Sequence, residues 1–128
     1  METIKETKQI RELTNSEIEE IFSLTKPYYF DCSNVVEREL KHNNYIYLLK
    51  NTFGGILSFF MVAWEKHKIQ SVERDVVYLG LSCASQNNQE KKLASKVYYN
   101  FTVDAFNYQQ KNSNKLVLYG TTVTPVVL

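Results

Sequence analysis

The segment from residue 75 to residue 128 constrains the fold of this chain more than any other. It contains a β-branched apolar run at 75–84, a polar turn, a long amphipathic pattern at 88–111 and a second apolar run at 115–121. A helix that connects two strands of one sheet makes those strands parallel. The start of such a helix presents unpaired backbone N–H groups beside the carboxyl ends of the strands, where a phosphate-bearing ligand can bind.

Cap residues and apolar spacing predict two helices nearer the amino terminus. Thr14-Asn15-Ser16 supplies three N-cap residues before several glutamates, which suit the positive end of a helix, and the apolar residues that follow share one face. Pro27 ends this helix or begins a kinked connection, and a second helix runs from a cap at 31–33 until Asn43-Asn44 breaks the pattern. We expect a short strand at 9–13 before them, from its alternation of apolar and polar residues.

Three β-rich runs follow the helices, at 45–50, 56–64 and 75–84. Gly54 and Gly55 permit positive φ angles in the first connection, so the first two runs are expected to be antiparallel neighbours. Residues 65–74 have a polar composition without Gly or Pro and are predicted to form a mobile connection.

Size and charge exclude several classes of protein. With 128 residues the chain is predicted to form a single domain, 1–128, with one core. Its formal charge of +1 gives no general reason to expect a nucleic-acid or membrane partner. No apolar run approaches the roughly 20 residues of a membrane span, and we expect a cytoplasmic protein.

Cysteine, histidine and aromatic residues carry weak signals. Cys32 and Cys83 lie far apart without ligand spacing, so we expect reduced thiols, no disulfide framework and no metal site. His42 could act as a base, but its place in the last turn of a helix favours an interaction with the helix dipole. The nine Tyr and seven Phe are interpreted as core and interface residues, with a base-stacking surface as the alternative.

Four short motifs fall at corresponding places in this order of elements. They are Gly55-Ile56-Leu57-Ser58-Phe59, the run 77–84, Gln89-x-x-Lys92-x-Ala94, and Leu118-Tyr119-Gly120-Thr121-Thr122. With the order strand, two helices, three antiparallel strands, helix, parallel strand, they resemble the GNAT N-acetyltransferase superfamily. The resemblance implies an α+β fold with a mixed sheet, β-α-α-β-β-β-α-β, abbreviated at the carboxyl end.

The resemblance also implies a site for acetyl-CoA. The fourth and fifth strands would splay apart, and the pantetheine arm would bind the backbone of Leu81, Ser82 and Cys83. The pyrophosphate would meet the turn and the helix start, at Gln89, Lys91, Lys92, Leu93, Ala94 and Ser95. Lys92 replaces the glycine usual in the family, which removes a close backbone approach but adds a cation.

Catalysis would require a base for the amine, stabilisation of the thioester oxygen and a proton for the leaving thiolate. Glu73 and Asp75, at the entrance of the fourth strand, are the candidate bases, and an N–H near Leu81 is the candidate oxyanion donor. Ordinary solvated carboxylates are the alternative reading. The family's leaving-group acid is commonly a tyrosine on a helix after the fifth strand, whereas Tyr119 lies on the strand itself.

Two function hypotheses based on the GNAT fold therefore stay open, together with a third hypothesis that assumes a different fold. The first is N-acylation of a small-molecule or peptide amine held over residues 26–33 and 65–74. The second is a catalytically inactive GNAT-like module that binds CoA or a protein. A PAS-like sensory domain is the third, and it predicts antiparallel pairing after the long helix. The apolar residues 122–128 suggest that the sheet edge is covered by the tail, by missing sequence or by a second copy in a homodimer.

Overall fold

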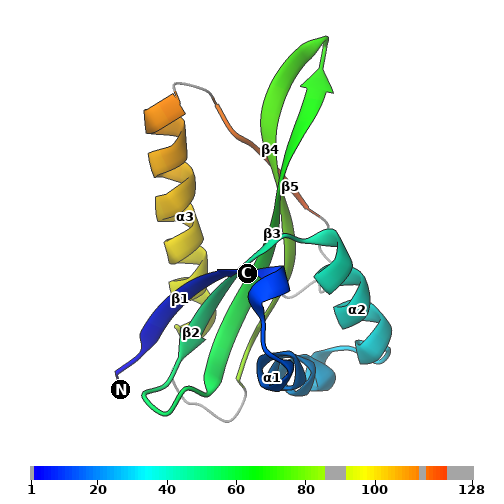
Figure 1. The fold of residues 1–128 in the computed structure, drawn as a ribbon, viewed down its shortest axis with the longest axis vertical. Coiled ribbons are helices and arrows are strands. Elements are labelled where there is room, and N and C mark those ends of the chain that lie inside the picture. The colour runs from blue at the N-terminus through cyan, green and yellow to red at the C-terminus, as the bar shows by residue number, and fades with distance from the viewer. Residues whose placement is uncertain (1, 86–91, 113–114, 121–128) are drawn as a thin grey trace.

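A computed structural model describes residues 2–85, 92–112 and 115–120 of the chain. Helices and short 3-10 turns (η) alternate with strands along the sequence (Figure 1). The elements are β1 (Ile4–Gln9), η1 (Ile10–Glu12), α1 (Asn15–Thr25), η2 (Lys26–Tyr28), α2 (Cys32–His42), β2 (Tyr45–Lys50), β3 (Ile56–Ile69), β4 (Val72–Ala84), α3 (Leu93–Asn112) and β5 (Val117–Gly120). This order confirms the predicted β-α-α-β-β-β-α-β arrangement.

The described strands form one mixed sheet in the order β1-β2-β3-β4-β5. Neighbouring strands are antiparallel from β1 to β4, whereas β4 and β5 are parallel, with Val77 opposite Leu118. The parallel pair confirms the crossover predicted from the strand-helix-strand pattern. It also shows that the PAS-like alternative, which required antiparallel pairing after the long helix, is wrong.

Helices cover both faces of the sheet. Figure 1 shows α1 and α2 on one side and α3 on the other. Ile21 and Val36 lie in the core between the first two helices and the sheet, while Val97 and Phe101 lie in the core under α3. The middle strands are buried on both faces, so they read as continuous apolar runs rather than alternating ones.

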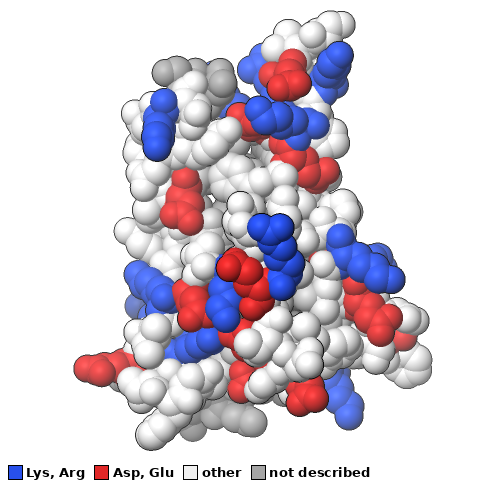
Figure 2. Space-filling view, in the orientation of Figure 1, with Lys and Arg blue, Asp and Glu red and all other residues white. Residues whose placement is uncertain are grey.

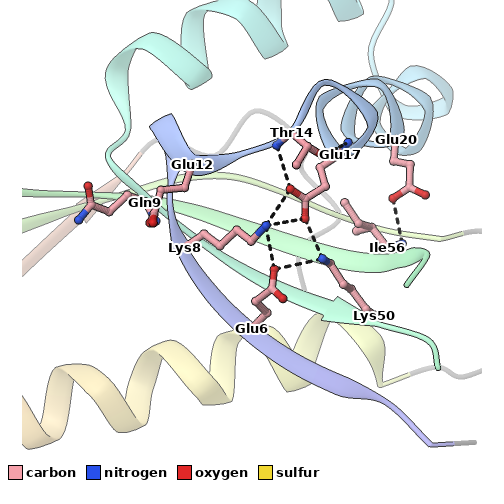
Figure 3. Close-up of polar contacts among 9 residues, drawn as sticks. All are labelled: Glu6, Lys8, Gln9, Glu12, Thr14, Glu17, Glu20, Lys50 and Ile56. Carbon is pink, nitrogen blue, oxygen red and sulfur yellow. Dashed lines mark hydrogen bonds and ion pairs between the residues drawn. The ribbon is translucent and has the colours of Figure 1, made fainter. Parts of the chain in front are cut away.

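The first strand lies at Ile4–Gln9, so the prediction of a strand at 9–13 is wrong. β1 stands at one end of the strand order and pairs with β2 from Ile4–Lys50 to Gln9–Tyr45. Its charged side chains form ion pairs: Lys8 contacts Glu17 on α1, and Glu6 contacts Lys8 and Lys50 (Figure 3). Charged side chains are common on edge strands, where they discourage pairing with other chains. They also remove the apolar alternation from which a strand is predicted.

A network of charged side chains joins β1, β2 and α1 (Figure 3). Thr14 is the N-cap of α1 and forms a capping box with Glu17. The Glu17 carboxylate also accepts hydrogen bonds from Lys8 Nζ at 2.9 Å and Lys50 Nζ at 2.7 Å. Burial opposes the charged form, but hydrogen bonds from Lys50, from the Thr14 backbone and from Lys8 lower the pKa of Glu17 to about 2.

The polar segment 65–74 forms part of a hairpin instead of the predicted mobile connection. β3 continues to Ile69, β4 begins at Val72, and the two remain paired up to the turn. Gln70 and Ser71 have φ angles of +52° and +65° in that turn, the backbone sign of a type I′ turn. The tip projects beyond the helices in Figure 1, so its side chains face water and lack an apolar stripe.

The long helix α3 runs from Leu93 to Asn112, and residues 86–91 before it lie outside the described part of the chain. Leu93 is buried at the helix start, and its carbonyl accepts a hydrogen bond from Ser58 Oγ on β3 at 2.9 Å. This contact holds the beginning of α3 against the sheet. None of the described helices is long and apolar enough to cross a membrane.

Candidate functional site

The described pairing between β4 and β5 covers four residues of each strand. Their pairing runs from Val76–Val117 to Leu79–Gly120, whereas β4 itself continues to Ala84. The backbone of residues 80–84 therefore extends past the last described pair with β5. In a parallel pair, this is the carboxyl end of both strands, where open sheets bind ligands.

A β-bulge lies just after the last described pair of β4 with β5. On β3 the residues Phe60 and Val62 pair with Ser82 and Leu79, so Met61 alone stands opposite two residues of β4. The bulge changes which face each β4 side chain occupies: Leu79 packs under α3, but Leu81 packs under α1 and α2. Bulges redirect local backbone and side chains, and they are frequent beside active sites.

The bulge brings the backbone of β4 against a buried carboxylate from α2. The Leu81 N–H donates a hydrogen bond of 2.7 Å to Glu39 Oε1, and Asn43 Nδ2 donates a longer one of 3.3 Å to the same oxygen. Glu39 is only 6% exposed. A Cβ on Gly80 would lie 2.8 Å from Glu39 Oε1, so glycine is required for this approach.

A pocket of about 220 Å³ opens between α2 and the strands β4 and β5. Aromatic rings form much of its wall: His42 contacts Tyr78 with ring centroids 4.5 Å apart, and Tyr78 contacts Tyr119 at 5.3 Å. Tyr78 Oη also lies 3.5 Å from Glu39 Oε2. The lining residues are Arg38, Glu39, His42, Tyr78 and Tyr119.

A second carboxylate stands beside this pocket. Glu65 Oε1 accepts a hydrogen bond from Tyr119 Oη at 3.1 Å and lies 3.9 Å from His42 Nε2. Its other oxygen lies 3.2 Å from His67 Nε2. Desolvation and the hydrogen bond to Glu65 raise the pKa of Tyr119. The pocket thus combines carboxylate, imidazole and phenol groups that can exchange protons with a bound ligand.

Comparison with known proteins gives a fold and no sequence relative. No family model matches the chain, and no curated protein matches it. Solved structures do match. A GNAT-family acetyltransferase from Streptococcus pneumoniae superposes with a TM-score of 0.61 at 12% identity, covering 97% of this chain and 79% of that one. An aminoglycoside acetyltransferase from an uncultured soil sample gives 0.62 at 10% identity, with 98% and 83% covered.

The chain has the GNAT N-acetyltransferase fold. A conserved protein from Enterococcus faecalis, named a probable N-acyltransferase, matches with a TM-score of 0.61 and 15% identity over 94% of this chain. This chain spans only 30% of the length of that protein. The predicted resemblance is therefore confirmed for the fold.

In the GNAT fold seen here, the three predicted pantetheine contacts lie at and beyond the bulge. Leu81 uses its N–H toward Glu39, as described, and its side chain is in the core. Ser82 faces α3, where its hydroxyl lies 2.5 Å from Tyr98 Oη. Cys83 is buried, and burial raises the pKa of its thiol to about 11, which suits a packing residue rather than a nucleophile.

The predicted pyrophosphate turn is only partly within the described chain. Gln89 and Lys91 lie outside the described residues. Lys92 is exposed and precedes α3, and its carbonyl accepts the first helical hydrogen bond, from the Lys96 N–H at 3.0 Å. The next N–H groups, of Leu93, Ala94 and Ser95, belong to the first turn, where α-helices leave amides without an intrahelical partner.

The two predicted bases lie on the projecting hairpin. The Glu73 side chain is 63% exposed and lies 3.8 Å from Lys66 Nζ. Asp75 is 13% exposed at its side chain and accepts a hydrogen bond of 2.7 Å from Tyr108 Oη on α3. An extended strand rises roughly 3.3 Å per residue, which puts Asp75 about 20 Å from Leu81. Neither residue lines the pocket.

Sequence reasoning missed the carboxylate that the structure places at the bulge. Glu39 belongs to a run of charged residues on α2, which reads as a water-facing stripe. The available signal was Gly80, because an isolated glycine inside a strand pattern indicates a bulge or a close backbone approach. His42, interpreted as a helix-end residue, does lie in the last turn of α2, but its ring also forms part of the pocket wall.

Proposed function

We propose that this chain is an acyl-CoA-dependent N-acyltransferase that transfers an acetyl group from acetyl-CoA to an amine. One observation carries the proposal: in a GNAT fold, β4 bulges just after its last described pair with β5, beside a pocket of ionisable side chains. We expect β4 and β5 to separate at this end of the sheet, so that an extended pantetheine arm can lie between them and pair its amides with β4.

The cofactor site extends from the expected separation of β4 and β5 to the start of α3. The backbone of Leu81, Ser82 and Cys83 is the proposed contact for pantetheine. The first-turn N–H groups of α3 are the proposed contact for the pyrophosphate, because helix starts attract anions through fixed dipoles. Exposed Lys92 adds a cation there. The proposed residues of this second part are Gln89, Lys91, Lys92, Leu93, Ala94 and Ser95.

The acceptor is proposed to be a small-molecule or peptide amine. The pocket between α2 and β5 is small, and its lining includes the Glu39 carboxyl group, whose oxygens can accept hydrogen bonds from an amine. One solved structure of this fold acts on aminoglycosides by name, which supports an amine acceptor. The face shown in Figure 2 carries intermingled acidic and basic side chains, which offers nucleic acid no continuous basic surface.

Other features of the proposal follow from the sequence. We propose one domain over 1–128 and a cytoplasmic location. Val117 and Leu118 on β5, at the end of the strand order, are 36% and 49% exposed. A second copy of the chain that covered this edge would bury them. The assignment of the base to Glu73 or Asp75 stays a prediction, for an acceptor that lies along the hairpin.

The alternative is a module that binds CoA or a protein without turnover. A specific observation favours it, since the Leu81 N–H already donates to Glu39 and so is engaged before any thioester arrives. Titration of CoA and acetyl-CoA by calorimetry, with an assay for released CoA thiol over a panel of amines, separates the two.

Binding should raise the free energy of unfolding, by about 2.7 kcal/mol at 100 times the dissociation constant. Binding with thiol release supports the transferase, and binding without release from any amine supports the module. No interaction at millimolar CoA would contradict both CoA-based functions.

A further inference from the structure

We propose that Glu39 closes the acyl site in the free protein, where the acyl site is the position at the Leu81 N–H that the thioester oxygen would occupy. Glu39 becomes the catalytic base when the thioester carbonyl displaces it. The inference rests on the proposed acyltransferase function and assigns a role to a residue on α2 that lies outside the predicted site. Its starting point is a single contact, the 2.7 Å hydrogen bond from the Leu81 N–H to Glu39 Oε1.

The bulge in β4 leaves the Leu81 N–H available to a partner outside the sheet. One residue of β3, Met61, stands opposite Gly80 and Leu81, so the regular ladder is interrupted at this point. The Leu81 N–H donates to a side chain of α2 instead. An N–H at this position is the donor that a developing oxyanion would need. A carboxylate oxygen and a thioester oxygen both accept hydrogen bonds, and they would compete for the same donor.

The Glu39 carboxylate is held by neutral hydrogen-bond donors. Glu39 is buried, and in the described part of the chain no Lys, Arg or His nitrogen lies within 4.0 Å of its oxygens. Its donors are neutral: the Leu81 amide, the Asn43 amide and, more distantly, the Tyr78 hydroxyl. A buried carboxylate without a cation is costly. An anionic or polar ligand can therefore replace Glu39 as the acceptor of the Leu81 N–H.

The pocket beside Glu39 offers a place for the displaced carboxylate. Glu39 already lines the pocket that Tyr78 and Tyr119 complete, and its Oε2 faces the Tyr78 hydroxyl at 3.5 Å. Asn43 Oδ1, next to it, is buried and has no hydrogen-bond partner within the described residues. A rotamer change would carry the carboxylate from the Leu81 amide into the pocket, toward a bound amine.

The chemistry balances with acyl-CoA and an amine as the two reactants. The amine nitrogen attacks the thioester carbon and forms the C–N bond, while the oxygen takes negative charge and the hydrogen bond of Leu81. The C–S bond then breaks, and its electron pair leaves on the CoA sulfur, which takes a proton from solvent. Glu39 receives the proton that the amine loses. Acyl-CoA must bind first, because it releases the base.

Affinities for CoA and acetyl-CoA test the first half of this inference, since the two ligands differ only in the acetyl group. In the wild type the acetyl oxygen must displace Glu39, and the two ligands are expected to bind within about threefold of each other. In Glu39→Ala the donor is free, and acetyl-CoA is expected to bind at least tenfold more tightly than CoA. Glu37→Ala, an exposed glutamate of the same helix, is the matched control and should keep the wild-type ratio.

Glu39→Gln guards against a Glu39→Ala protein that does not fold, because it keeps the shape of the side chain. Its amide oxygen is a weaker acceptor than a carboxylate, so the affinity ratio should rise several-fold in favour of acetyl-CoA. It cannot take the amine proton, so transfer should fall at least a hundredfold. Opposite effects on acetyl-CoA binding and on turnover are not expected of a residue that only supports the fold.

The outcomes separate this inference from the function on which it rests. If the wild type binds neither CoA nor acetyl-CoA, the acyltransferase proposal fails, and the role of Glu39 fails with it. If both ligands bind and the ratio in Glu39→Ala, or in Glu39→Gln where the alanine variant is unfolded, equals that of the wild type, the acyltransferase proposal stands and Glu39 does not close the site. A raised ratio with unchanged turnover would overturn the role as base.

Discussion

Lys50 Nζ lies 2.7 Å from Glu17 Oε2 and thereby ties β2 to the first turn of α1. Lys8 Nζ contacts the other oxygen of the same carboxylate at 2.9 Å (Figure 3). The Glu17 side chain is only 10% exposed. A partly buried carboxylate between two ammonium groups remains charged well below its ordinary pKa, so this network makes stability depend on pH.

The contribution of Glu17 to stability should vanish in acid. Its pKa is lowered from 4.5 to about 2 in the folded protein, so the unfolded chain takes up its proton first as pH falls. The stabilisation is therefore complete above about pH 4.5 and is lost as pH falls toward 2. Urea unfolding at several pH values should show this slope. Glu17→Gln should flatten it, while Glu19→Gln, on an exposed position of α1, should not.

Gly80→Ala should destabilise the protein by about 1–3 kcal/mol through overpacking. The added Cβ would lie 2.6 Å from Asn43 Nδ2 and 2.8 Å from Glu39 Oε1, and both side chains are buried. Denaturant unfolding measures the loss. Removing the Asn43 side chain should restore room, so the cost of Gly80→Ala should be smaller in an Asn43→Ala background. An equal cost in both backgrounds would show that the contact with Asn43 is not its source.

The turn of the β3–β4 hairpin should accept a stabilising substitution. Gln70 and Ser71 both have positive φ angles, which side chains other than Asn, Asp and Gly rarely favour. Gln70→Asn combined with Ser71→Gly should stabilise the protein by about 0.5–1 kcal/mol by relieving this strain. Thermal unfolding measures it. A lower midpoint for the double variant would mean that the turn has another backbone geometry.

Gln89→Ala combined with Ala94→Asp should abolish CoA affinity while the protein stays folded. The aspartate would bring negative charge and bulk to the first turn of α3, where the pyrophosphate is proposed to bind. Calorimetry measures the affinity and circular dichroism the fold. Gln110→Asp adds the same charge at an exposed position near the other end of α3 and should keep the wild-type affinity. Unchanged binding in the double variant would place the site elsewhere.

The identity of the base can be decided by comparing two carboxylates. Glu73 is exposed on the hairpin, whereas Glu39 lines the pocket at the bulge. With Glu39 as the base, Glu73→Gln should keep turnover within about twofold of the wild type and Glu39→Gln should lose at least a hundredfold, because a base must reach the amine. Initial rates of thiol release at saturating acetyl-CoA measure both. The reverse pattern would support the hairpin carboxylates instead.

Much of the fold was predictable because its signals are local. The capping box of Thr14 and Glu17 marks the start of α1 within one turn of chain. The stripe of Leu93, Val97 and Phe101 marks the buried face of α3, and a helix between two strands constrains them to be parallel. In each case the residues that carry the signal are close in sequence.

The elements that were predicted wrongly, β1 and the outer β3–β4 hairpin, depend instead on contacts beyond their own sequence. β1 is a polar edge strand whose charges are neutralised by Lys50 and Glu17, which lie far along the chain. The outer half of the β3–β4 hairpin is exposed and has no apolar stripe. Its pairing extends outward from a buried part of the same strands, so neither element carries the local apolar pattern that predicts a strand.

Sequence alone determined the order and type of most elements, because helix caps, apolar periodicity and the crossover rule act over a few residues. Tertiary structure alone decided the candidate site. Leu81 and Glu39 are 42 residues apart, and they meet because a bulge in β4 turns one amide toward α2 while Gly80 leaves room for the carboxylate. Whether a charged side chain faces water or a buried amide depends on what packs against it, which no short stretch of sequence contains.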